Sequence, residues 1–155
     1  MSLLIRDYRS GDAGAAALLF YETVRATALR DYSDVQIVAW APEIPDPAQW
    51  HQRMSARHSF IADKSGYMLG FAELEADGHL DMLYVARDFV GTGIGSALLD
   101  HTERHARSLG LARIFTEASK TARPLFERKG FVLVAEQEVM RNGTPLMNYR
   151  MEKRL

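Results

Sequence analysis

Cysteine is absent from the 155-residue sequence. Its absence excludes disulfide bonds, metal sites built on thiolates and a cysteine nucleophile. Long apolar runs are absent too, because none approaches the roughly 20 residues that a membrane-spanning helix needs. The first residues also lack the basic and then apolar order of a secretory signal. We therefore expect a cytoplasmic protein that has no membrane partner.

Neither sign of charge is in excess. The 19 Lys and Arg residues nearly balance the 20 Asp and Glu residues, which leaves a formal net charge of -1. Because there is no long basic block either, nucleic acid is not expected as a partner. The chain is long enough for one core, and no repeat or linker rich in Pro, Gly or Ser divides it. We expect a single domain over residues 1–155.

Hydrophobic periodicity predicts both helices and strands. Helices are expected over residues 13–32 and 33–40, from 46–50 onward, from the glycine segment to about 110, and over 121–130. Strands are expected over residues 3–9, 59–63, 66–76, 79–86, 112–118, 131–140 and 145–153. Ser33 and Gln36 have the spacing of a capping box, and Asp46 precedes a proline as a helix cap. Asn142-Gly143 is a strong hairpin turn. This order predicts an α+β protein with a mixed, mostly antiparallel central sheet of about seven strands flanked by helices.

Three glycines stand at alternate positions, Gly91, Gly93 and Gly95, between an expected strand and an expected helix. A helix start presents unpaired N–H groups and partial positive charge, and glycine lets a phosphate group approach that backbone closely. A turn that needs several positive φ angles is the plainer alternative, and three glycines in this context make it the weaker one. A Walker loop would need a lysine after the last glycine, and a dinucleotide fingerprint would need glycine where Ser96 stands. The segment therefore indicates a pyrophosphate site of another kind.

The glycine segment and the stretch from Ala118 to Phe131 together resemble the GNAT superfamily of N-acetyltransferases. The family's loop usually reads Gln/Arg-x-x-Gly-x-Gly, and its later segment reads Asn-x-x-Ala-x-x-Leu-Tyr-Glu-x-x-Gly-Phe. The pairing of residues 18–42 with residues 79–89 resembles the YafP-like bacterial branch in particular. By this resemblance the ligand is acetyl-CoA, Ser119 faces its pantetheine arm and Phe126 lies near the thioester. The resemblance also implies that the backbone of Leu83, Tyr84 and Val85 pairs with pantetheine, and that the pyrophosphate lies on Val90, Gly91, Thr92, Gly93, Ile94, Gly95 and Ser96.

Three positions depart from the family pattern. Val90 replaces Gln or Arg, Ser119 replaces asparagine, and Phe126 replaces the tyrosine that often serves as general acid. The missing acid is tolerable, because a thiol pKa near 8.5 means that a thiolate leaves unprotonated at a cost of about 2 kcal/mol. Supplying a neutral lysine-like amine at pH 7 costs roughly 4–5 kcal/mol. The general base therefore matters more than the acid.

Candidate bases lie just before the glycine segment. By strand alternation His79 and Asp81 share one face with Leu83 and Val85. Histidine titrates near neutrality, which suits a base, and Asp81 could orient it or attract the ammonium. Glu73 on the preceding strand is a third candidate. The alternative is that these are ordinary polar residues at a sheet edge.

Aromatic and basic side chains are less specific. Tyr21 and Tyr32 are expected to contact the acceptor, whereas Trp40 and Trp50 are expected in the core. His101 and His105 lie one helical turn apart, but no third ligand is near them in the sequence, so no metal is expected. Five basic residues flank the two motifs, and one or two are expected to meet the CoA phosphates: Arg87, Lys120, Arg123, Arg128 and Lys129.

The sequence thus predicts transfer of an acetyl group from acetyl-CoA to a primary amine of a small molecule or peptide. With no cysteine to carry the acetyl group, direct attack in a ternary complex is expected. Val90 and Phe126 support the alternative of a non-catalytic acyl-CoA-binding or regulatory module. The family resemblance also implies a possible homodimer, for which an exposed strand of the last hairpin is the expected contact.

Overall fold

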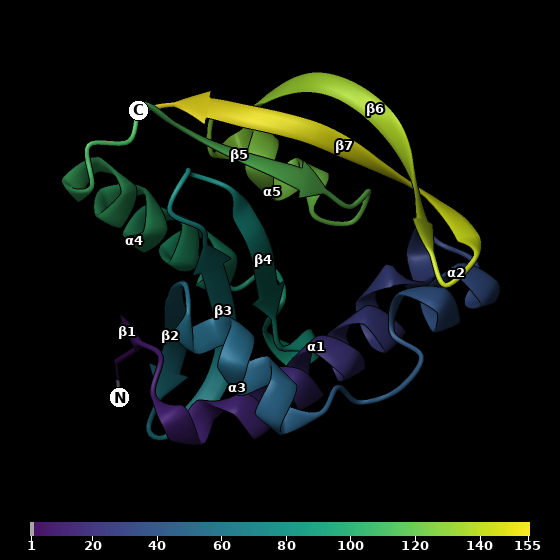
Figure 1. Cartoon of the computed structure of the whole chain (residues 1–155), viewed down its shortest axis with the longest axis horizontal. Helices are drawn as coiled ribbons and strands as arrows, with labels where there is room; N and C mark the ends of the chain where they lie inside the picture. The colour runs from purple at the N-terminus through teal and green to yellow at the C-terminus, as the bar shows by residue number, and fades with distance from the viewer. Residues whose placement is uncertain (1) are drawn as a thin grey trace.

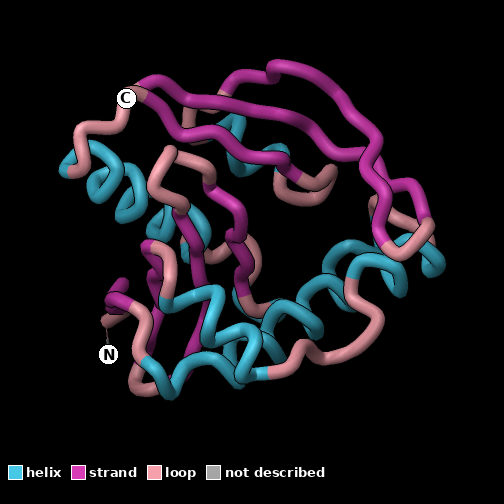
Figure 2. Tube along the Cα trace, viewed as in Figure 1, coloured by secondary structure: helices cyan, strands magenta, loops and turns pink. Residues whose placement is uncertain are grey.

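The computed structural model describes residues 2–155, and these form seven strands, five α-helices and three short 3-10 helices (Figures 1 and 2). The strands are β1 (Leu4–Asp7), β2 (His58–Lys64), β3 (Tyr67–Leu74), β4 (Leu80–Val85), β5 (Arg113–Ala118), β6 (Val132–Arg141) and β7 (Thr144–Arg154). The α-helices are α1 (Ala13–Thr27), α2 (Asp34–Trp40), α3 (Pro47–Ser55), α4 (Ile94–Ser108) and α5 (Arg123–Arg128). The 3-10 helices are η1 (Ser10–Asp12), η2 (Ala28–Arg30) and η3 (Arg87–Phe89). None of the helices within residues 2–155 has the length and apolar character needed to cross a bilayer.

The strands form two antiparallel sheets, which confirms the expected α+β class and strand number but corrects the single central sheet. One sheet has the order β1-β2-β3-β4 and the other β5-β7-β6. They meet at one parallel bridge, between His79 and Phe115. Beside it, the Phe115 amide donates to the Gly78 carbonyl (3.1 Å) and the Thr116 hydroxyl donates to the Leu80 carbonyl (2.7 Å). Beyond this junction β4 and β5 diverge, as Figure 1 shows.

Helices cover both faces of the larger sheet. Successive side chains of a strand point to opposite faces, and on the inner strands the side chains on both faces are apolar. On β3, Leu69 and Ala72 pack into a core that includes Leu98 of α4, and Phe71 packs on the other side with Phe20 and residues of α3. Burial of each large apolar side chain contributes about 1.5–3 kcal/mol. The two cores therefore fix β4 between α4 on one side and α1 with α3 on the other.

The expected caps and turns are present. Ser33 accepts from the Gln36 amide (3.2 Å) while the Gln36 side chain accepts from the Ser33 amide (3.0 Å), a complete capping box for α2. Asn142 and Gly143 both have positive φ, 49° and 78°, as a two-residue hairpin turn requires. The Asn142 side-chain amide donates to the Ala39 carbonyl (2.7 Å). This bond ties the tip of the β6–β7 hairpin to α2.

Candidate active site

A β-bulge in β4 sets the direction of the side chains near the junction. Glu73 pairs with Met82 and Leu74 pairs with Leu80, so Asp81 is the extra residue. Leu80 and Leu83 both pack into the core beside α4. The prediction that Asp81 shares a face with Leu83 and Val85 is therefore wrong, because the bulge turns its carboxylate to the α3 side.

The edge of β4 that faces the opening carries free backbone groups. The Ala86 amide donates to the Leu69 carbonyl (2.8 Å), and alternation along an antiparallel pair then turns the N–H and C=O groups of Leu83 and Val85 away from β3. The Thr23 hydroxyl donates to the Val85 carbonyl (3.0 Å). The Leu83 groups and the Val85 amide remain directed into the opening, where an extended ligand can pair with them as an added strand.

The glycine segment forms the turn between η3 and α4. Gly91 and Gly93 have φ of +79° and +92°, and a Cβ on either would meet no atom within 4 Å. Their lack of a side chain is required by backbone conformation and leaves open space above the loop. Gly93 is the N-cap of α4, and no side chain among residues 2–155 caps that helix. Its first amides are thus available to an anion.

Gly95 has a different role from the other two glycines. A Cβ there would lie 2.7 Å from Cδ2 of Leu125. The glycine lets α5 approach the first turn of α4 closely. The two helices thereby narrow the space above the loop.

A cleft of about 490 Å³ runs between these elements. All of the predicted cofactor-binding residues line it except Thr92, Ile94 and Phe126. Its wall also includes residues from the last turns of α1, the start of η2 and α5, namely Thr23, Val24, Thr27, Ala28, Pro124 and Leu125. The bare edge of β4 and the uncapped start of α4 thus open into one space.

The predicted position of Phe126 near the thioester is corrected. Its ring is 2% exposed and packs edge-on against Phe131 with centroids 5.0 Å apart. Leu125 lines the cleft from α5 in its place. Ile94 is likewise buried, in the core beneath α4. The family motif predicts the helix that carries Phe126, but the ring of Phe126 turns toward the core.

Four charged side chains form an ionic cluster on the α3 side of the bulge. Arg53 and Arg57 both contact Oε1 of Glu73, at 2.9 and 2.6 Å, and both contact Oδ2 of Asp81. Glu73 is fully buried, and its Oε2 has no hydrogen-bond partner among the described residues. Burial raises the pKa of Asp81, but the hydrogen bond from Arg57 and the positive charge of Arg53 outweigh it and hold this pKa below its usual value. Arginine side chains therefore occupy both Glu73 and Asp81 in this arrangement.

His79 is held between two carboxylates at the junction of the sheets. Its Nδ1 lies 2.7 Å from Oε1 of Glu75, and its Nε2 lies 2.8 Å from Oε1 of Glu117. The ring stacks on Phe115 at 5.1 Å. The bond to Glu117 first, and then that to Glu75, raise the pKa of His79 to about 9 although burial opposes them. His79 is therefore a cation at neutral pH, which corrects the expectation that it titrates near neutrality.

Three potential metal-ligand atoms meet between His79 and the ionic cluster. Those of Glu75, His79 and Asp81 lie within 4.8 Å of one another. Arg57 already neutralises Asp81, and it lies 3.8 Å from Glu75. The carboxylates of Glu75 and Asp81 thus have Arg57 and His79 as cationic partners in place of a metal ion.

The two predicted acceptor tyrosines do not line the cleft. The Tyr32 hydroxyl donates to the Met147 carbonyl (2.7 Å) and accepts from the Lys120 amide (2.9 Å), so it joins the hairpin to the turn before α5. Tyr21 lies beneath the guanidinium of Arg25, 4.9 Å from the ring centroid. Neither tyrosine lines the cleft, and contact of either with the acceptor stays a prediction.

The aromatic side chains that do line the cleft are Trp40 and Tyr84. Trp40 was expected in the core, and its position at the cleft is a further correction. Trp50 is buried as expected. Burial raises the pKa of Tyr84, while a hydrogen bond from Trp40 opposes this. Tyr84 is therefore a neutral phenol in the wall of the cleft.

Of the five flanking basic residues, Arg128 lines the cleft. Arg123 pairs with Glu127, and Lys129 lies 2.7 Å from Asp100. Arg128 is thus the flanking cation best placed to meet a phosphate group.

Arg53, Arg57 and Glu117 were not among the predicted site residues. Glu117 had a visible signal, because it alternates with Phe115 on the expected strand and so shares its face. The arginines lie on α3 and just after it, and no sequence pattern linked them to β3 and β4.

Comparison with known proteins gives a consistent result. Residues 28–153 match the family described as "Acetyltransferase (GNAT) domain". The chain is 31% identical over 150 residues to the uncharacterized N-acetyltransferase YafP of Escherichia coli (strain K12). The matched region covers 97% of this chain and 95% of YafP.

Solved structures agree. A GCN5-related N-acetyltransferase from Rhodopseudomonas palustris, also described as a class-II aminotransferase, superposes with a TM-score of 0.94 at 34% identity, covering 100% of this chain and 97% of the other. The fold also matches PaiA N-acetyltransferase of Thermoplasma acidophilum in complex with coenzyme A, with a TM-score of 0.81 at 18% identity and full coverage of both chains. The chain therefore belongs to the GNAT family of acetyltransferases, in its YafP-like branch.

Proposed function

We propose that this protein transfers an acetyl group from acetyl-CoA to a primary amine by direct attack within a ternary complex. The observation that carries the proposal is the cleft in which the outward edge of Leu83 and Val85 opens onto the uncapped start of α4. An extended amide chain linked to a pyrophosphate fits both features. Acetyl-CoA has that arrangement of groups.

The cofactor contacts follow from the groups present. The amides after Gly93 would hold the pyrophosphate, and Arg128 would add a charged contact from α5. The Leu83 and Val85 edge would pair with the amides of the pantetheine arm. The Ser119 hydroxyl accepts from the Ala122 amide (3.0 Å), and its own proton remains available to the ligand.

Transfer requires one bond to form and one to break. The amine nitrogen attacks the thioester carbon, the C–S bond breaks and CoA leaves as a thiolate. The Leu83 backbone lies beside the expected position of the carbonyl and would stabilise the oxyanion. Before the attack, the neutral form of His79 in the His79–Glu117 pair would take the proton of the ammonium and pass it to solvent.

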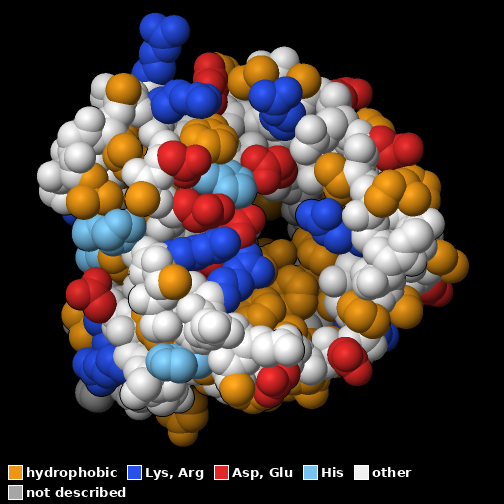
Figure 3. All heavy atoms as spheres, in the orientation of Figure 1, with side chains coloured by type: hydrophobic (Ala, Val, Ile, Leu, Met, Phe, Trp, Pro, Cys, Tyr) orange, Lys and Arg blue, Asp and Glu red, His pale blue; other side chains and the backbone are white. Residues whose placement is uncertain are grey.

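The acceptor is proposed to enter from the face shown in Figure 3. This face has a central hollow with a hydrophobic floor, and charged side chains of both signs gather along one side of it. Asp81 and Glu117 follow directly after Leu80 and Thr116, the last residues that join the two sheets. This places the His79–Glu117 pair at the point where the sheets separate, next to the proposed entrance for the acceptor.

Release of CoA tests this proposal directly. Because the chain has no cysteine, a thiol-reactive dye reports free CoA without a background from the protein. With acetyl-CoA and a panel of small and peptide amines, we expect release that depends on the amine. Binding of acetyl-CoA without release for any amine would favour the non-catalytic module that Val90 and Phe126 suggest.

The pH dependence of kcat/KM is expected to identify the proton acceptor. The carboxylates stabilise the imidazolium, so kcat/KM should rise with pH up to about 9, where His79 loses its proton. Glu117→Gln removes the largest stabilising bond and should move the rise toward the ordinary value of about 6.5, and Glu75→Gln should move it less. A rise that stays in place in both variants would belong to the acceptor amine instead, and the role of the pair would be rejected.

A further inference from the structure

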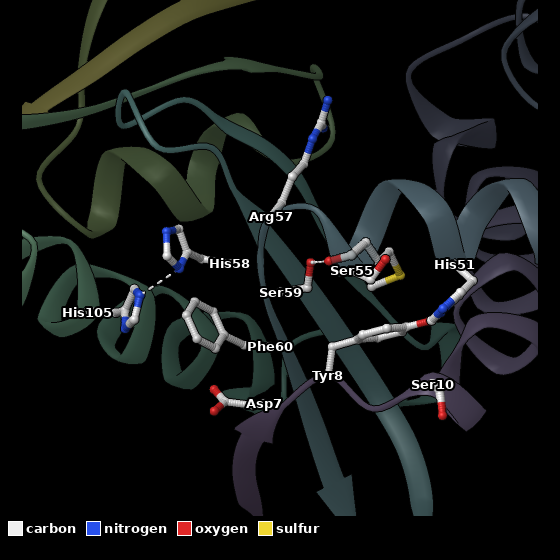
Figure 4. A pocket seen from close by; sticks show the side chains of 11 residues that line it. Asp7, Tyr8, Ser10, His51, Ser55, Arg57, His58, Ser59, Phe60 and His105 are labelled. Atoms are coloured by element: carbon white, nitrogen blue, oxygen red, sulfur yellow. Dashed lines mark hydrogen bonds between the residues drawn. The ribbon is translucent and has the colours of Figure 1, made fainter.

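A second cavity, of about 370 Å³, lies between β1, β2, α3 and α4 (Figure 4). Its aromatic polar side chains bind one another: Nδ1 of His51 lies 2.7 Å from the Tyr8 hydroxyl, and Nδ1 of His58 lies 3.0 Å from Nε2 of His105. Groups that already have hydrogen-bond partners offer little to a ligand. Polar side chains without partners are found instead on the β6–β7 hairpin.

One face of this hairpin combines apolar and polar side chains. Leu146 of β7 lies in the same core as Tyr84, whereas Met151 lies in the core beside α4. Because side chains alternate along a strand, Asn148 and Arg150 share the face of Leu146. We call this the inner face of the hairpin, and its residues on the two paired strands are Ala135, Gln137, Val139, Arg141, Thr144, Leu146, Asn148 and Arg150. None of them lines the acetyl-CoA cleft.

Arg150 brings the inner face to the His79–Glu117 pair. It lies directly across from Glu117 in the pairing of β5 with β7, and side chains paired in this way share one face with Cβ atoms about 5 Å apart. Glu117 bonds to His79 (2.8 Å), and Arg150 is exposed and forms no ion pair within residues 2–155. An unpaired cation therefore lies beside the pair that would take the proton of the amine.

The rest of the inner face carries no negative charge. Glu136 and Glu138 are the acidic residues of β6, and they alternate with Val139 and so project from the other face. Arg141 is exposed at the end of β6 and belongs to the inner face. The inner face thus has two arginines and no carboxylate, a combination that favours an anion.

Asn148 adds a polar group beside Arg150. Its side-chain Oδ1 is buried and has no hydrogen-bond partner among residues 2–155. Buried polar groups in folded proteins are nearly always hydrogen-bonded, so this amide indicates a contact with a ligand. A half-turn of the side-chain amide exchanges its oxygen and its nitrogen, which lets Asn148 donate to an anion.

We propose that the acceptor is a small amine that also carries an anionic group, and that Arg150 and Asn148 bind this group while the amine lies at the His79–Glu117 pair. The inference rests on the proposed function and names the class of its acceptor. Arg150 and Glu117 are direct neighbours across β5 and β7, so one small molecule can reach both positions. An amino acid and an aminoalkyl phosphate both have an amine and an anion at such a separation.

Matched pairs of acceptors test for the anion. L-amino acids are compared with their amides, and 2-aminoethyl phosphate is compared with ethanolamine, by release of CoA from acetyl-CoA. Loss of a charge-assisted hydrogen bond should lower kcat/KM about tenfold or more for the uncharged member of a pair. The basicity of the amine works against this preference, because a nearby carboxylate keeps more of the amine protonated. The pair that shows the preference identifies the anion as a carboxylate or a phosphate.

Variants locate the anion site. Arg150→Met should reduce the preference for the charged acceptor to near parity, mainly through a higher KM, and Asn148→Leu should reduce it less. Arg154→Met removes the same charge from β7 about 13 Å further along the strand and should keep the wild-type preference. All three variants should bind acetyl-CoA with the affinity of the wild type, which shows that they are folded.

NMR reports binding of the acceptor without turnover. With CoA present, the side-chain amide signals of Asn148 should move on addition of the charged acceptors and stay in place with the uncharged ones. The inference is overturned if both members of every pair release CoA equally or if the preference survives in Arg150→Met, and in both cases acetyl transfer itself stands. If no amine releases CoA, the proposed function fails, and Asn148 signals that do not move then reject the anion site as well.

Discussion

Gly93→Val should weaken acetyl-CoA binding about tenfold or more while the protein stays folded. Gly93 has a φ of +92°, a conformation that a β-branched residue can adopt only with strain of about 1–3 kcal/mol. The loop would move to relieve that strain, and the amides at the start of α4 would lose their common direction. Each lost bond to a charged ligand costs roughly 1.5–3 kcal/mol, and 1.4 kcal/mol is a factor of ten in affinity. Calorimetric titration of acetyl-CoA measures the effect.

The same helix provides a matched control. Gly110 has a φ of +75° and, like Gly93, no atom within 4 Å of an added Cβ, but it follows the last turn of α4, about 25 Å away. Gly110→Val should therefore cost similar stability and leave the affinity unchanged. Equal affinities in both variants and the wild type would reduce Gly93 to a simple turn residue and remove the main support for the pyrophosphate site.

Simultaneous replacement of Arg53 and Arg57 by methionine should lower the free energy of unfolding by about 3–5 kcal/mol, which is the effect of leaving a buried carboxylate without a partner. Glu73 is fully buried and Asp81 is partly buried, and both arginines contact each of them. Each single replacement leaves one guanidinium with both carboxylates, so its effect should be much smaller. Methionine keeps most of the stem volume and so limits the loss of packing. Urea unfolding at pH 7 measures the free energy of unfolding of the wild type, the two single variants and the double variant, which together form a double-mutant cycle.

Two further variants identify the cause. Adding Glu73→Gln to the double variant removes the unpaired charge and should restore part of the lost stability. Arg113→Met breaks an ion pair with Glu152 that is largely exposed, and should cost less than about 1 kcal/mol. If the double variant loses only the sum of the single effects and Glu73→Gln restores nothing, the carboxylates do not depend on the arginines.

Local rules predicted most of the backbone. The capping box at Ser33, the cap before Pro47 and the turn at Asn142-Gly143 each depend on residues within three positions of one another, and all are present. The glycine segment was predictable for the same reason, because its φ angles belong to the loop itself. These features need no knowledge of the rest of the fold.

The side chains around the candidate active site could not be predicted in this way. The β-bulge makes Asp81 an extra residue, so its side chain points to the opposite face from the one that strand alternation predicts. No residue type in the neighbouring sequence indicates this bulge. Arg53 and His79 come from elements that meet only in the folded protein, so the pKa of His79 follows from tertiary contacts with Glu75 and Glu117. The position of Phe126 could not be predicted either. From α5 its ring could face the core or the cleft, and packing against Phe131 decides for the core.

The divergence of β4 and β5 also bears on how the protein behaves when acetyl-CoA is scarce. A strand edge with free N–H and C=O groups can pair with another chain, which is a route to aggregation. Beside Leu83, β5 has diverged from β4 and does not pair with it. Under the proposed function, the pantetheine arm of acetyl-CoA pairs with this edge of β4 instead. Any ligand that binds only the folded state also stabilises it in proportion to the logarithm of its concentration. Solubility and lifetime in the cell would then follow the supply of acetyl-CoA, so that abundance as well as turnover would respond to metabolic state.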